Sequence, residues 1–285
     1  MKISVLSGKG GTGKTTIAVG IANTIEGSIK TDCDVDAANM HLFYKGEQIN
    51  SEEFYSGEKA YIDIDKCIKC GICEENCKFN AIKNNKIDLL KCEGCGVCSL
   101  VCKSNAIILS KNKVANIFEY KLEDGYLIKA DMEIGADGSG RLITKLRENT
   151  KKYGDINIID GSPGIGCSVI ASVTGIDIAL IVTEPTLSGL DDLKRILELT
   201  KTFNVLSLVC INKYDINLDM SQKIEKYCIE NNIQVISKIP YDNFVLKSIN
   251  ELKPITLYKD SEAGKKVKEI SEKILGIYQD IKTKK

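Results

Sequence analysis

The chain has 285 residues, enough for about two domains of ~150 residues each. Its 39 lysines and arginines balance 39 aspartates and glutamates, so no net field attracts nucleic acid or an anionic membrane, and we expect neither as a partner. No apolar stretch reaches the ~18 residues that a membrane-spanning helix needs. Because the chain opens on a strand-like run without a signal peptide, its twelve cysteines predict reduced thiols in a cytoplasmic protein.

The first predicted strand, residues 2–7, runs into a glycine-rich loop with the sequence GKGGTGKTT at residues 8–16. Glycines let backbone N–H groups surround phosphates, and the helix predicted at 17–25 adds the partial positive charge of its N-terminus. In this G-x4-G-K-[ST] pattern we expect Lys14 to reach the β- and γ-phosphates and the Thr15 hydroxyl to ligate Mg²⁺. The predicted nucleotide-binding residues of the loop are Gly8, Lys9, Gly10, Gly11, Thr12, Gly13, Lys14, Thr15 and Thr16.

The second predicted strand, residues 28–33, leads into an acidic segment that contains Asp32, Asp34 and Asp36. Isolated aspartates in such a place are more often helix caps or solvated surface residues. Their position directly after the second strand of a phosphate-binding unit is what favours a role in catalysis.

Eight cysteines form two runs of identical C-x2-C-x2-C-x3-C spacing, and each cysteine of the first run has its counterpart 25 residues later. This spacing is typical of [4Fe–4S] sites, in which the fourth ligand of each cluster comes from the other run. Zinc is the weaker alternative, because it needs fewer cysteines and often takes His, and the single histidine lies far from the runs. The predicted ligands are Cys67, Cys70, Cys73 and Cys102 for one cluster, and Cys92, Cys95, Cys98 and Cys77 for the other.

The segment 58–110 resembles a bacterial-type two-cluster ferredoxin. It departs from that pattern where Lys78 and Lys103 replace the proline that usually follows the fourth cysteine. Proline is not a ligand, so cluster binding is still expected. A nearby ammonium favours the more negative reduced cluster, and we therefore expect reduction potentials that differ from the family's usual range.

The rest of the chain alternates predicted strands and helices, which indicates an α/β fold with a doubly wound, mainly parallel sheet. A hairpin is predicted at 117–132, broken at Asp124-Gly125. The nucleotide-binding domain is therefore predicted to be discontinuous, residues 1–57 and 111–285, with the small α+β ferredoxin-like domain inserted at 58–110. The further strands are predicted at 156–160, 177–183, 205–211 and 233–239, and the further helices at 140–152, 188–202 and 219–231.

Lys9 stands ahead of the glycines, so that the loop reads K-G-G-x-G-K-T and resembles the deviant Walker A motif of the MinD/ParA/Mrp ATPases, relatives of the nitrogenase iron protein. In that family this lysine crosses a dimer interface to the partner's phosphates. The resemblance implies an ATP-bound homodimer in which catalysis is assembled between subunits. The alternative is a solvated lysine of the loop.

The resemblance extends to two switch segments. It implies that Asp34 positions or activates the attacking water and that Asp36 assists at Mg²⁺. The strand at 156–160 and the following GSPGIGC segment look like Walker B joined to switch II, which implies that Asp160 holds Mg²⁺ through water and that Gly164 lets the loop follow the γ-phosphate. The predicted catalytic residues are Lys9, Lys14, Asp34 and Asp160.

Recognition of the base is ambiguous from the sequence. The segment Asn212-Lys213-Tyr214-Asp215 matches the N-K-x-D motif that reads guanine in many GTPases. In the MinD-like family, however, the equivalent asparagine contacts adenine. The deviant Walker A motif outweighs the four-residue match, and we expect ATP, contacted by Asn212.

The remaining cysteines and the last helix have more than one interpretation. Cys167 lies seven residues after Asp160, the offset of an intersubunit cluster ligand in the nitrogenase iron protein. The simpler expectation is a small buried residue, as for Cys33, Cys210 and Cys228.

The terminal helix is expected to cover the sheet, and a membrane-binding tail is the alternative. Its apolar face comprises Val267, Ile270, Ile274, Ile277 and Ile281.

Three functions fit these motifs. The leading hypothesis is an ATP-gated electron-transfer protein, in which ATP closes the dimer and an unidentified redox partner docks. A second is an Mrp-like carrier that delivers iron–sulfur clusters to an acceptor, although the chain has no C-x-x-C outside the two runs. A third is a MinD-like positioning ATPase with structural clusters, against which the neutral charge counts.

Overall fold

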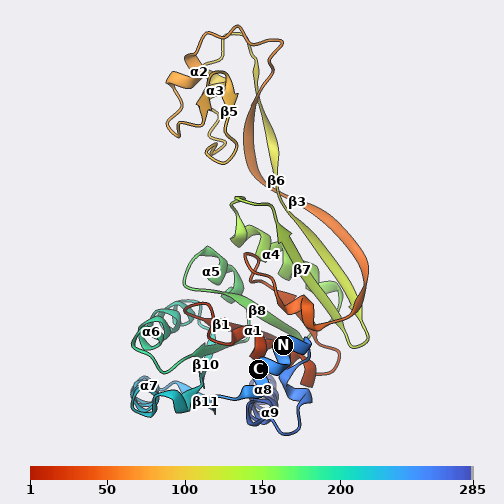
Figure 1. The fold of residues 1–285 in the computed structure, drawn as a ribbon, viewed down its shortest axis with the longest axis vertical. Helices are drawn as coiled ribbons and strands as arrows, with labels where there is room; N and C mark the ends of the chain where they lie inside the picture. The colour runs from red at the N-terminus through yellow and green to blue at the C-terminus, as the bar shows by residue number, and fades with distance from the viewer. Residues whose placement is uncertain (284–285) are drawn as a thin grey trace. The chain divides into compact units, whose positions relative to one another are not determined.

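The computed structural model describes residues 1–283, which form two compact units (Figure 1). The large unit comprises Met1–Ser51, Ile117–Asp131 and the chain from Ser139 onward. The small unit comprises Glu52–Asn116 and Met132–Gly138 and contains both cysteine runs. It therefore starts before residue 58 and ends after residue 110, and the segment 132–138 joins it because the Glu133 N–H donates to the Val114 carbonyl (2.8 Å).

A sheet with the strand order β11-β10-β9-β1-β8-β2-β7-β6-β3 forms the frame of the large unit, and its strands β6 and β3 continue into the small unit. The strands are β1 (Lys2–Ser7), β2 (Ile29–Asp32), β3 (Gly46–Ile62), β6 (Ile107–Leu122), β7 (Tyr126–Met132), β8 (Asn157–Pro163), β9 (Ile178–Thr183), β10 (Leu206–Asn212) and β11 (Gln234–Ile239). The pairs from β11 through to β7 are parallel. The prediction of a mainly parallel α/β sheet is confirmed.

The helices of the large unit are α1 (Lys14–Thr24), α4 (Ser139–Asn149), α5 (Cys167–Val173), α6 (Leu187–Thr202), α7 (Leu218–Glu230), α8 (Asn243–Glu251) and α9 (Glu262–Thr283). Helices cover both faces of the parallel part, which is why a central strand such as β9, with the sequence IALIVT, is buried at every position. Ile3 and Val5 of β1 pack with α1 and α9, whereas alternate residues such as Leu6 point to the opposite face, where α5 and α6 contact β1.

Helix α9 covers the sheet, as expected for an amphipathic surface helix. Val267, Ile270 and Ile274 are buried in the core cluster with α1, and Ile277 packs partly buried against it. None of the helices within residues 1–283 is long and apolar enough to cross a bilayer.

The hairpin predicted at 117–132 is formed by β6 and β7, with its turn at Asp124-Gly125. Gly125 has a φ of +83°, and a Cβ there would lie 2.2 Å from the carbonyl oxygen of Ser28. A residue with a side chain does not fit this approach, so the glycine fixes where the hairpin turns back toward β2.

The small unit contains two copies of one local structure. Short helices α2 (Ile72–Glu75) and α3 (Val97–Leu100) follow left-handed glycines, Gly71 with a φ of +76° and Gly96 with a φ of +80°. Asn80 and Asn105 share a φ of +50°, and the strands β4 (Ile82–Lys83) and β5 (Lys86–Ile87) form a two-stranded sheet. The duplication in the sequence is therefore also a duplication of the backbone.

Candidate functional site

The loop between β1 and α1 is shaped by two close approaches. A Cβ on Gly13, whose φ is +86°, would lie 2.5 Å from Nδ2 of Asn212. A Cβ on Gly8 would lie 2.1 Å from the Cβ of Asp192. Both positions require glycine, and α1 begins directly after the loop at Lys14, so its N-terminal N–H groups lie where a phosphate would bind.

Four predicted residues converge at the carboxyl ends of β1, β2 and β8. Nζ of Lys14 lies 2.6 Å from Oδ1 of Asp160 and 3.2 Å from Oδ2 of Asp34. The Thr15 hydroxyl donates to Oδ2 of Asp160 (2.6 Å). Burial opposes the charge of Lys14, but the two carboxylates outweigh it and raise the pKa of Lys14 above its usual value. Thr15 and Asp160 are thus adjacent oxygen donors of the kind that Mg²⁺ prefers.

Asp32, for which no separate role was predicted, lies behind this group and fixes the loop that follows β2. Its side chain is fully buried and accepts from the N–H groups of Asp34 (3.2 Å) and Met40 (2.9 Å). Burial, followed by the charge of Asp160, raises the pKa of Asp32 to about 8. Asp36 is exposed in the same loop.

Lys9 points to the start of α6. Its Nζ lies 3.3 Å from the Ser188 hydroxyl and 3.8 Å from Oε2 of Glu184, and its side chain is 37% exposed. Glu184 also accepts from Lys213 (2.6 Å). Lys9 therefore has a charged partner of its own within the chain. Its side chain is also accessible at the surface.

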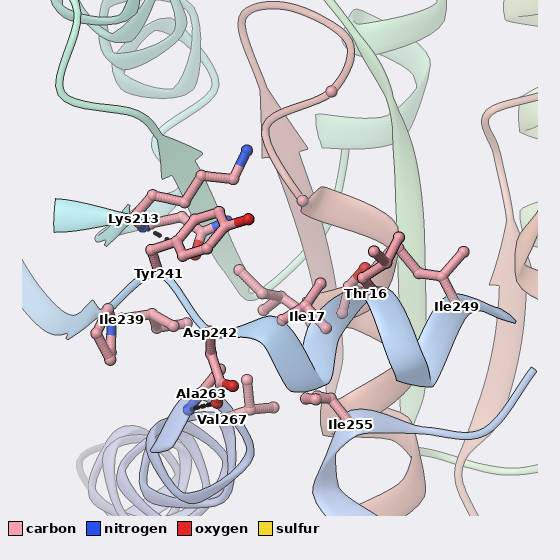
Figure 2. A pocket seen from close by; sticks show the side chains of 16 residues that line it. Thr16, Ile17, Lys213, Ile239, Tyr241, Asp242, Ile249, Ile255, Ala263 and Val267 are labelled. Carbon is pink, nitrogen blue, oxygen red and sulfur yellow. Dashed lines mark hydrogen bonds between the residues drawn. The ribbon is translucent and has the colours of Figure 1, made fainter. Parts of the chain in front are cut away.

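A mainly apolar pocket opens beside the glycine loop (Figure 2). Thr16 and Ile17 of α1, Tyr241 and Ile249 around α8, and Val267 of α9 contribute to its walls. It encloses about 780 Å³, including space open to solvent, which is in the size range of small-molecule sites. Asn212, predicted from its motif to contact the base, lines this pocket, whereas the part built by residues 239–249 was not predicted, because it carries no phosphate-binding motif.

Polar groups fix the edges of the pocket. Asn212 donates to the carbonyl oxygen of Thr12 (2.8 Å), and the Thr12 hydroxyl is buried without a partner among the described residues. Asp242 caps α8 by accepting from Phe244 N (2.8 Å), and it accepts from Ala263 N (3.0 Å) as well.

The segment after β8 turns at glycines. Gly164 has a φ of +95°, and its N–H donates to the Ser7 carbonyl (2.9 Å), which ties the segment to the end of β1. The Ser162 hydroxyl donates to the carbonyl of Cys33 (2.6 Å). The two segments predicted as switches are therefore linked to each other and to the phosphate loop.

In the small unit the structure sorts the eight cysteines into two sets of four. One cavity is lined by Cys67, Cys70, Cys73 and Cys102, and a second by Cys77, Cys92, Cys95 and Cys98. Each cavity thus holds three cysteines of one run and the fourth of the other. Cysteine, alanine and isoleucine side chains around them form the core of the small unit.

Backbone N–H groups donate to the sulfurs of Cys77 and Cys102, the fourth cysteine of each run. The Ala81 N–H donates to Sγ of Cys77 and the Ala106 N–H to Sγ of Cys102, both at 3.3 Å. Such donors stabilise negative charge on sulfur. In residues 1–283 no group of three His, Cys, Asp or Glu side chains is placed to hold a single metal ion. The four cysteines that line each cavity match in number the four thiolates that a [4Fe–4S] cluster would take.

The expectation for Cys167 was wrong. Cys33, Cys210 and Cys228 are fully buried, as expected, but Cys167 is exposed. It is the first residue of α5, and its Cβ and carbonyl lie against Gly140 at the start of α4 rather than in the core.

A parallel sheet with a glycine loop and a buried Lys–Asp pair at its carboxyl edge defines the class of P-loop nucleotide-binding proteins. Residues 3–255 match the model of the CobQ/CobB/MinD/ParA nucleotide binding domain, and the chain belongs to this family. The predicted relation to MinD and ParA ATPases is confirmed at this level.

Individual relatives are similar over nearly the whole chain. An uncharacterized protein of Methanocaldococcus jannaschii is 37% identical over 279 residues, 96% of each chain. An iron-sulfur cluster carrier protein of Pyrococcus abyssi is 26% identical over 308 residues, covering 99% of this chain and 88% of the relative. The structure of the septum site-determining protein MinD of Pyrococcus horikoshii with Mg-ADP has the same fold, with a TM-score of 0.59, 20% identity, and coverage of 95% of this chain and 94% of that one.

Proposed function

We propose that the protein is an ATP-hydrolysing electron carrier that binds two [4Fe–4S] clusters in the small unit and Mg²⁺-ATP in the large unit. The observation that carries this proposal is the sorting of the cysteines into two cavities, each with three members of one run and the fourth of the other. This exchange is typical of two-cluster ferredoxins. When bound, the clusters supply one-electron storage.

The roles in the large unit follow from its contacts. Lys14 neutralises the β- and γ-phosphates, and Thr15 and Asp160 hold Mg²⁺. Asp34, 3.2 Å from Lys14 and half-buried, orients the attacking water. Asp36 and Gly164 lie in the two segments that respond to the γ-phosphate. Lys9 reaches the phosphates of a second subunit in an ATP-bound homodimer.

The hydrogen bond that Asp215 already makes within the chain supports adenine rather than guanine as the base. In the N-K-x-D motif the aspartate must accept from the base, but here Oδ1 of Asp215 accepts from the Tyr241 N–H (2.7 Å). Lys213 is paired with Glu184. The mostly apolar pocket beside Asn212 and Tyr241 then takes the adenine ring (Figure 2).

The test is anaerobic purification followed by iron analysis, electron paramagnetic resonance after dithionite reduction, and potentiometry with and without Mg²⁺-ATP. We expect about eight irons per chain and potentials that shift with nucleotide. The variant Lys14→Ala should keep the irons and lose the nucleotide-dependent shift. Potentials and transfer rates that do not respond to nucleotide would remove the basis for gating.

A second candidate, an iron–sulfur cluster carrier, is favoured by the name of the Pyrococcus abyssi relative. It predicts transfer of intact clusters to an apo-ferredoxin, with loss of iron from this protein. Electron transfer predicts no iron transfer to apo-ferredoxin, but reduction of a cluster-containing ferredoxin with all irons of this protein retained, so the two acceptors separate the two candidates.

A further inference from the structure

A second cavity of the large unit lies between α4 and α5 and shares no lining residue with the apolar pocket. It encloses about 1080 Å³, including space open to solvent. One face of α4, from Arg141 through Thr144 to Arg147, forms one wall, and α5 with Cys167 forms the other. We call this cavity the α4–α5 groove.

The α4–α5 groove is positively charged, although the whole chain is neutral. Lys2, Arg141, Arg147 and Lys151 line it, and Glu148 is the one acidic residue among the lining residues. Four cations around one concave surface raise the local concentration of anions more than the same charges dispersed over a convex surface.

Among the residues that the structure describes, no carboxylate pairs with Arg147. Its guanidinium donates to the carbonyl oxygen of Ala171, and its Nε is buried without a partner within the described part of the chain. Burial lowers the pKa of Arg147, and the neighbour that opposes this shift is the Cys33 thiol rather than an acid. Burying a cation without a counter-charge costs free energy, and an anion that pairs with the guanidinium recovers part of it through charge-assisted hydrogen bonds.

We propose that the α4–α5 groove binds a small, multiply charged anion whose phosphate or carboxylate groups pair with Arg147 and Lys151. The planar guanidinium group of Arg147 matches the two oxygens of either group, and the lysine adds charge. The exposed cations alone bind weakly, so most of the affinity comes from Arg147. The ligand lies against α5, the helix that follows the glycine segment after β8.

The experiment is isothermal titration calorimetry on the full chain with its clusters, in saturating Mg²⁺-ADP so that the phosphate loop is occupied. Glycerol 3-phosphate is the phosphate probe and tricarballylate the carboxylate probe. We expect saturable binding of at least one probe, weakening as sodium chloride is raised. Arg147→Gln should weaken it at least tenfold, because a charged hydrogen-bond partner is lost.

A second variant keeps Arg147 and its bond to Ala171. Thr144 is exposed, and its hydroxyl bonds only locally to the Gly140 carbonyl (3.0 Å), so Thr144→Glu should fold while placing a carboxylate in the groove. It should also weaken binding at least tenfold. Lys201→Gln, which removes an exposed cation from α6, is the control and should bind as the wild type does. Wild-type protein that binds neither probe, or folded Thr144→Glu protein that binds with unchanged affinity, would overturn the proposal.

Discussion

Lys14 and Asp160 form a buried ion pair, with Nζ 2.6 Å from Oδ1 and side chains that are 6% and 1% exposed. The second oxygen of Asp160 accepts from Thr15. One carboxylate at the end of β8 thus holds both the lysine and the threonine of the phosphate loop. Asp34, at 3.2 Å, is the other carboxylate paired with Lys14.

Asp160→Asn should lower the free energy of unfolding by about 3 kcal/mol, because it leaves the buried Lys14 charge with one acidic partner instead of two. It should also abolish ATP hydrolysis, since an amide is a poor ligand for the metal. Urea denaturation and phosphate release measure the two effects. The control is Asp191→Asn, which breaks an exposed pair with Lys194 at 3.6 Å and should cost less than about 1 kcal/mol. Equal losses in both variants would contradict the structural role of the buried pair.

Gly13→Ala should weaken nucleotide binding at least tenfold, and Gly276→Ala, in α9, should not. The added methyl of Gly13→Ala would meet Nδ2 of Asn212 at 2.5 Å and would sit on a left-handed backbone, so both Asn212 and the loop must move. At Gly276, an exposed position of α9 outside the nucleotide site, nothing lies within 4 Å of the added carbon. Titration with a fluorescent ATP analogue compares the two variants. Similar affinities for both would show that the contact with Asn212 does not shape the loop.

Lys9→Ala should keep nucleotide binding and lose nucleotide-dependent dimerisation. Within its own chain Lys9 contacts Ser188 and Glu184 at the surface, so its removal costs at most about 1 kcal/mol of stability. Light scattering with a non-hydrolysable ATP analogue measures the oligomeric state. Wild-type protein should form a dimer and the variant a monomer. A dimer of Lys9→Ala would reduce Lys9 to the solvated loop lysine that the sequence left as the alternative.

The parallel sheet and the phosphate loop were predictable because both depend on patterns of residues that are close together in the sequence. The strands β1, β9 and β10 are short, mostly apolar runs, and the glycine loop follows the first of them. The long strand β3 was not predicted, because its sequence is polar and it is mostly exposed, so neither alternation nor apolar content marks it. The wall of the apolar pocket at residues 239–249 was missed for another reason. It depends on α8 and α9 meeting α1, a contact between segments far apart in the chain.

The exposure of Cys167 could not be predicted from the sequence. A small apolar residue after a glycine segment usually turns into the core. Here the short helix α5 starts at this residue and presents it to the α4–α5 groove, beside a glycine of another helix. Only the packing of α4 against α5 decides that orientation.

The stability of the large unit should fall as the pH drops below the ordinary pKa of histidine. His41 is the single histidine of the chain, and burial, followed by the charge of Lys129, lowers its pKa in the folded state. The unfolded state therefore takes up a proton first, so the stability is full above pH ~6.5 and decreases below it. Thermal unfolding between pH 7.5 and 6 should show this loss in the wild type and less of it in His41→Gln. Parallel curves for the two proteins would contradict the burial of the imidazole.

The exchange of the fourth cysteine between runs can be tested with two double variants that each remove two cysteines. Cys70 and Cys102 line the same cavity, whereas Cys70 and Cys77 belong to the same run but line different cavities. Cys70→Ala/Cys102→Ala should therefore retain one cluster, about four irons per chain, and Cys70→Ala/Cys77→Ala should lose both. Iron analysis and electron paramagnetic resonance read the outcome, and unchanged nucleotide binding shows that the large unit is folded. The reverse pattern would mean that each run binds its own cluster.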